Sequence, residues 1–150
     1  MRSSRGRRGW LHPRLQVSLS GVALGLAALA AGPSGAADRN APFVISIEDA
    51  SVKVGEPAVI VATIATRGGF TITESYRHRI LQLSASEGVE LPGKVVRGSV
   101  RDGRVVFSVG VTARKAGAHS VVGLFRFSFH NGRQIDITSA PFEATVTATE

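Results

Sequence analysis

The chain has 150 residues, no cysteine and a formal charge of +7. Without cysteine, the protein forms no disulfide bond and carries no lipid anchor on a cysteine. Most of the excess charge lies in the first 14 residues, which hold five arginines and no acidic residue. After residue 37, 13 of the 18 Lys and Arg residues remain against all 11 Asp and Glu residues, a charge of +2. This near-neutral balance predicts no binding to nucleic acid, which requires several phosphates to be neutralised together.

The first 37 residues are predicted to be an export signal peptide. The basic stretch MRSSRGRRGWLHPR precedes the apolar run LQVSLSGVALGLAALAAG, and Gly35 and Ala37 are spaced for cleavage before Asp38. The stretch RRGWLH fits a twin-arginine signal, an ordinary secretory signal fits as well, and an uncleaved membrane anchor is the third alternative. The predicted location is the periplasm or the secreted fraction, with membrane contact only through an uncleaved signal.

Residues 38–150 predict a single all-β domain. Val, Ile, Thr and Phe are frequent, and short runs are divided by Gly, Pro, Asp-Gly and Asn-Gly. No segment sustains the 3.6-residue apolar period of a helix. Short strands joined by hairpin turns indicate a two-sheet antiparallel sandwich, immunoglobulin-like in the broad sense. The expected strands are 43–48, 58–66, 70–75, 78–84, 94–101, 104–112, 118–130, 133–138 and 142–148.

A first hairpin is expected at Asp102-Gly103, because glycine tolerates the positive φ of a two-residue turn. In this register Gly98 faces Phe107 and leaves room for its ring. The other expected cross-strand pairs are Arg101–Arg104, Val100–Val105 and Val96–Val109.

A second hairpin is expected in FRFSFHNGRQIDI, where three phenylalanines at alternate positions share one face. A two-residue loop at Asn131-Gly132 would place the Asp136 carboxylate opposite Phe127, in the core. A three-residue loop over 130–132 avoids this, since a slip of one residue exchanges the two faces of a strand. The expected pairs are then Phe127–Ile135, Phe125–Ile137 and Arg126–Asp136.

The first candidate site lies on the face opposite the phenylalanines, where Val122 and Leu124 precede Arg126. A strand that is apolar on both faces is covered by other elements, bulged near Gly123, or part of an interface. We take Val122, Leu124 and Arg126 as a candidate docking face for a protein partner.

The second candidate site is a basic patch for an anionic ligand or an acidic partner. Its alternative is a set of solubilising charges on outer sheet faces. The patch comprises Arg77, His78, Arg79, His130 and Arg133.

The other candidate chemistries find little support. The histidines His78, His119 and His130 could carry a metal or a small ligand, but no pair has a spacing that fixes metal geometry. The sequence has no nucleophile motif and no phosphate-binding glycine loop, so we expect neither an enzyme nor a cofactor.

Three stretches resemble the periplasmic N-terminal domain of the thiol:disulfide interchange protein family: GGFTITESYRHRILQLSASEGVELPGKVV, KAGAHSVVGLFRFSFHNG and SAPFEATV. The resemblance implies an immunoglobulin-like sandwich. It places the family's two redox cysteines near Ser128 and Gln134, which face each other in the three-residue-loop register. Since neither residue forms a disulfide, the resemblance implies the scaffold without the redox chemistry. The predicted function is an exported, non-enzymatic accessory module that binds an unidentified periplasmic protein.

Overall fold

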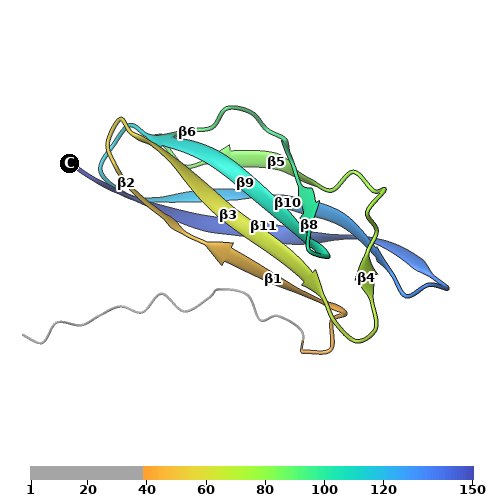
Figure 1. The fold of residues 1–150 in the computed structure, drawn as a ribbon. Coiled ribbons are helices and arrows are strands. Elements are labelled where there is room, and N and C mark those ends of the chain that lie inside the picture. Colours follow the sequence, from red (N-terminus) through yellow and green to blue (C-terminus); the bar gives the residue numbers. More distant parts are fainter. Residues whose placement is uncertain (1–38) are drawn as a thin grey trace, which may run out of the picture. The chain divides into compact units, whose positions relative to one another are not determined.

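The computed structural model describes residues 39–150, and the predicted export signal at 1–37 lies outside them. The described part forms strands in two sheets (Figure 1). Within it there is no helix, and hence none that could cross a membrane. The strands are β1 (Phe43–Glu48), β2 (Ala50–Lys53), β3 (Pro57–Thr66), β4 (Thr71–Ile72), β5 (Arg79–Ala85), β6 (Val89–Glu90), β7 (Val96–Arg97), β8 (Ser99–Arg101), β9 (Arg104–Ala113), β10 (Gly117–His130) and β11 (Ile135–Thr149).

The first sheet has the order β1-β3-β9-β6, with β8 also paired to β9. The second sheet has the order β2-β11-β10-β5-β7, with β4 also paired to β10. All pairs are antiparallel except β2 with β11, which are parallel. The chain passes from the first sheet to the second between β1 and β2. The inner faces enclose a common core, which confirms the predicted all-β, immunoglobulin-like sandwich.

The core contains the phenylalanine face that the sequence predicts. Phe125, Phe127 and Phe129 of β10 are all buried. The Phe125 ring lies 5.3 Å from the ring of Phe107 in the first sheet and 5.3 Å, edge-on, from that of Phe142 in β11. Such contacts join the two sheets, and each buried aromatic side chain contributes about 1.5–3 kcal/mol of burial free energy.

Several strand limits differ from expectation. Strands β2 and β6 were not predicted, and the two strands expected over 133–148 are the single strand β11, which passes through Pro141. The strand can continue through Pro141 because, within residues 39–150, its edge facing away from β10 is unpaired there. On that edge β2 pairs only with Val146–Thr149. The amide N–H of Thr145 donates to Asp49 Oδ1 (2.8 Å), outside the β10 ladder. Pro141 lies four residues before Thr145, so its backbone nitrogen also faces away from β10. The N–H that proline lacks is therefore not needed for a hydrogen bond between β10 and β11.

The first hairpin has the predicted register in part. Its pairs Arg101–Arg104 and Val100–Val105 are confirmed. A Cβ atom on Gly98 would lie 2.7 Å from the Phe107 ring, which confirms that this glycine leaves room for the ring. The pair Val96–Val109 was wrong: Val96 pairs with Ile80 in the second sheet, since the chain crosses between the sheets at Gly98.

The second hairpin has a different register from the expected one. The loop spans four residues, 131–134, and is closed by Asn131, whose Oδ1 accepts hydrogen bonds from the N–H groups of Arg133 (3.0 Å) and Gln134 (2.9 Å). The expected pairs with Ile135, Ile137 and Asp136 were therefore wrong. The observed pairs include Phe127–Thr138, Phe125–Ala140 and Arg126–Ser139.

The shifted register turns both isoleucines outward. Ile135 is 68% exposed and Ile137 is 53% exposed, whereas Thr138 and Ala140 lie on the inner face. These smaller residues stand opposite the rings of Phe127 and Phe125, so at this end of the sheet β10 supplies the large core side chains.

Candidate functional site

The predicted docking residues lie together on the outer face of the second sheet. Val122, Leu124 and Arg126 alternate with the buried positions of β10, between β11 and β5. Val122 is 40% exposed, Leu124 is half-buried and Arg126 is exposed. Within residues 39–150 no element covers Val122, so a covered strand is not the explanation in this part of the chain.

Cross-strand pairing extends this face into a row. Leu124 stands opposite Leu81 of β5 on one side and opposite Pro141 of β11 on the other. Directly opposed residues project from the same face of a sheet. We call Leu81, Leu124 and Pro141 the apolar row, with Val122 beside it. Leu81 and Pro141 were missed by sequence reasoning, because only the strand register reveals them.

A β-bulge in β5 lies beside the apolar row. The pairing of β10 with β5 shifts between Val122 and Leu124, so an irregularity lies next to Gly123, although not in the strand that carries this glycine. The extra residue is in β5, where Gln82 has a left-handed backbone with φ of 53°. Leu81 and Leu83 are two positions apart and would share a face in a regular strand. The bulge instead leaves Leu81 outside and buries Leu83 in the core.

A second row lies next to the apolar row and consists of arginines. Arg79 of β5 is opposite Arg126 of β10 on one side and opposite Arg97 of β7 on the other. We call Arg97, Arg79 and Arg126 the arginine row. The structure gives none of the three an ion-pair partner within residues 39–150. The Nε atom of Arg79 is buried and has no hydrogen-bond partner.

His78 is not the surface histidine that the sequence predicts. Its side chain is 2% exposed, with Nε2 2.9 Å from the carbonyl oxygen of Thr73. The N–H of Ser128 donates to Nδ1 (3.4 Å), so Nε2 carries the proton. Burial lowers the pKa of His78, against the raising effect of the hydrogen bond to Thr73. The imidazole has a structural role. Its Nδ1 accepts the hydrogen bond of Ser128 N–H at a position of β10 that neither β4 nor β5 pairs with.

The other members of the predicted basic patch are more dispersed. Arg77 and Arg133 are exposed in connecting segments, and His130 Nδ1 accepts a hydrogen bond from Gly132 N–H (3.2 Å) in the hairpin loop. His130 is four residues beyond Arg126 on β10, about 13 Å along the strand. Only Arg79 of the patch stands in direct register with the docking face.

The histidines do not converge on a metal site. His119 is nearly buried, with Nε2 2.8 Å from the carbonyl oxygen of Lys115. It is eleven residues from His130 on the same strand, a separation of about 36 Å. Within residues 39–150, no three His, Asp or Glu side chains gather closely enough to hold a metal ion.

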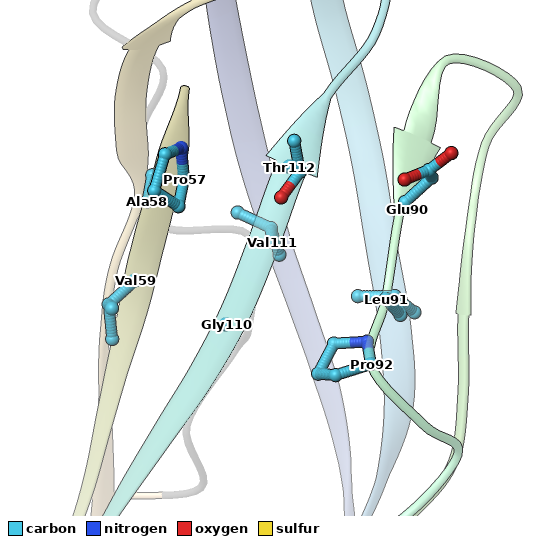
Figure 2. Close-up of a pocket in the computed structure, with 9 residues that line it drawn as sticks. All are labelled: Pro57, Ala58, Val59, Glu90, Leu91, Pro92, Gly110, Val111 and Thr112. Atoms are coloured by element: carbon cyan, nitrogen blue, oxygen red, sulfur yellow. The ribbon is translucent and has the colours of Figure 1, made fainter. Parts of the chain in front are cut away.

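A groove of about 360 Å³ lies on the first sheet, between β3 and the segment that follows β6 (Figure 2). Gly110 of β9 forms its floor, and Val59 and Pro92 stand on either side. Its one charged lining residue is Glu90, whose carboxylate pairs with Arg114 at 2.8 Å. That hydrogen bond and charge lower the pKa of Glu90. Among the described residues that line the groove, Glu90 is the single ionisable side chain.

No protein-family model and no curated protein matches the sequence. Among solved structures, the chain is similar to the seventh ScaB type I cohesin from Pseudobacteroides cellulosolvens, with TM-score 0.47 and 11% identity over 71% of this chain and 92% of that chain. It is also similar to AggA, the major subunit of aggregative adherence fimbriae type I from Escherichia coli, with TM-score 0.39 and 12% identity over 72% and 95% of the two chains.

The resemblance to the thiol:disulfide interchange family stays a prediction, but one detail of it was wrong. Ser128 is opposite Ile137 rather than Gln134, since the four-residue loop shifts the register. Ser128 is fully buried and its hydroxyl lies 3.0 Å from Thr73 Oγ1. This position is therefore closed by the segment between β4 and β5.

Proposed function

We propose that the chain is an exported, non-enzymatic module that binds a periplasmic protein through the apolar row and Val122. The observation that carries the proposal is the open apolar surface in the middle of the second sheet, where Val122 is 40% exposed beside Leu124. A contiguous apolar patch on an outer sheet face is typical of a protein interface, because solvated sheet faces are otherwise polar.

Export of the full chain is the first testable part of this proposal. N-terminal sequencing of the protein recovered from the periplasmic fraction should begin at Asp38. Replacing Arg7 and Arg8 with lysine should abolish recovery if the twin-arginine route is used, and leave it unchanged for an ordinary secretory signal. A product that retains Met1 and stays in the cytoplasm would contradict export.

Docking is tested by the double variant Val122→Glu and Leu124→Lys in the full chain. Chemical cross-linking in cell envelopes should capture a stoichiometric partner with the native protein. We expect at least a tenfold loss of this complex in the double variant, because an apolar interface centre tolerates charge poorly.

The matched control is Val44→Glu on the outer face of β1, in the first sheet. Val44 is 40% exposed, as Val122 is, so the two positions accept a charge with similar effects on folding. The control should keep the complex. Equal retention of the partner by the double variant and by Val44→Glu would overturn the proposed docking face.

A further inference from the structure

We propose that the docking face recognises an acidic segment of a protein partner, with its carboxylates on the arginine row and an apolar side chain on the apolar row. This inference rests on the proposed function, because it specifies the chemistry of the partner at the same face. The two rows are adjacent: Arg126 and Leu124 are two residues apart on β10, about 6.6 Å along the strand.

The arginine row carries an uncompensated positive charge. Like charges directly opposite one another in a sheet repel, and here Arg79 has an arginine on both sides. Two other basic side chains within residues 39–150 have acidic partners, Arg114 with Glu90 and Lys115 with Glu87. The three arginines of the row lack such partners, so an anion from outside relieves their repulsion.

The buried Nε–H of Arg79 gives independent support. A buried donor without an acceptor is unfavourable, and buried polar groups in folded proteins are almost always hydrogen-bonded. Arg97 and Arg126, which flank Arg79, are exposed and free to reorient. A carboxylate placed among the three arginines supplies an acceptor for Arg79, and guanidinium groups bind carboxylates through two parallel hydrogen bonds.

The surroundings favour a peptide over other anions. Neighbouring strands are about 4.8 Å apart, so Arg97 and Arg126 are about 10 Å apart across β5. An extended peptide that runs across the strands between the two rows would present its acidic side chains to the arginine row and its apolar side chains to the apolar row, because successive residues project to opposite sides. A bare phosphate would make no favourable contact with the adjoining apolar row, because it has no apolar group. Glu143 stands opposite Val122, beyond the apolar row, and would repel acids there and so orient the segment.

The test measures binding of a fluorescent peptide of alternating glutamate and leucine to the full-length chain. The control peptide has glutamine in place of glutamate. We expect the glutamate peptide to bind at least tenfold more tightly, and more weakly as salt is raised. The variants Arg97→Gln and Arg126→Gln should each weaken it several-fold. Their thermal unfolding should occur at or above the temperature of the native chain, because each variant removes one of the mutually repelling charges.

Arg101→Gln is the matched control, because Arg101 also faces an arginine, Arg104, but lies in the first sheet. It removes the same charge and should leave binding unchanged. Equal binding of the two peptides, no binding of the glutamate peptide, or equal effects of Arg97→Gln and Arg101→Gln would overturn the proposal. Tighter binding to phosphatidylglycerol vesicles than to the peptide, lost in Arg126→Gln, would overturn it in favour of a membrane surface.

The envelope cross-linking experiment separates this proposal from the one on which it rests. If the Val122 and Leu124 double variant loses its partner while the arginine variants keep it, the face binds a protein but not through carboxylates. If all these variants keep the partner, the docking face itself is wrong.

Discussion

Replacing Phe125 with alanine is expected to lower the free energy of unfolding by about 3–5 kcal/mol, which is a large part of the total stability of a small domain. Phe125 is fully buried, and its ring connects Phe107 of the first sheet with Phe142 of β11. Its removal leaves a cavity where the two sheets meet. Urea unfolding followed by circular dichroism measures the loss.

Ile137→Ala is the control for this prediction. Because the Ile137 side chain is 53% exposed on the outer face, its truncation should change the free energy of unfolding by no more than about 0.5 kcal/mol. A loss as large as that of Phe125→Ala would mean that Ile137 faces the core. That outcome would restore the three-residue hairpin loop and contradict the observed register.

Acidification is expected to destabilise the fold through His78. Burial holds the pKa of folded His78 below its ordinary value of 6.5. Between that lowered pKa and 6.5, the unfolded chain binds a proton that the folded chain does not, so stability falls as the pH falls. Protonation of Nδ1 would also remove the acceptor of the Ser128 N–H and place a cation between Arg77 and Arg79 in the sequence.

The variant His78→Gln tests this effect. It should lose about 1–3 kcal/mol at pH 8 for each backbone group left without a partner, at Ser128 and at Thr73. Its stability should then depend less on pH just below 6.5 than that of the native chain, as measured by urea unfolding across this range. His130→Gln serves as the control, because it removes a half-buried histidine at the end of β10 that contacts neither Thr73 nor Ser128 through a hydrogen bond. Parallel pH profiles for the native chain and His78→Gln would refute the assignment.

Local sequence patterns predicted the strands and their inner faces well. The alternation in FRFSFH places three rings in the core, and Asp102-Gly103 sets the first hairpin. Patterns failed where a single side chain decides the geometry. Asn131 closes a four-residue loop through its side-chain oxygen Oδ1, and this shifts the register of the partner strand.

The candidate site was predictable only in part, because its rows run across strands that are distant in the sequence. Val122, Leu124 and Arg126 follow from one strand alone. The arginine row also requires the pairing of Arg79 with Arg97, and the crossing at Gly98 that creates β7 has no local signal apart from the glycine itself. His78 was misplaced because charged neighbours in the sequence suggested solvent, whereas its ring completes the hydrogen bonds of β10.

The bulge in β5 also limits how the length of this strand can vary. Gln82 is the extra residue of β5 in the pairing with β10. Leu81 stands opposite Leu124, and Ser84 stands opposite Val122. A chain lacking Gln82 would keep both contacts and regain a regular strand. A chain lacking Ile80 instead would bring Arg79 opposite Phe125, facing the core. Related sequences that bind in the same way should therefore tolerate a deletion at this one position and not at its neighbours.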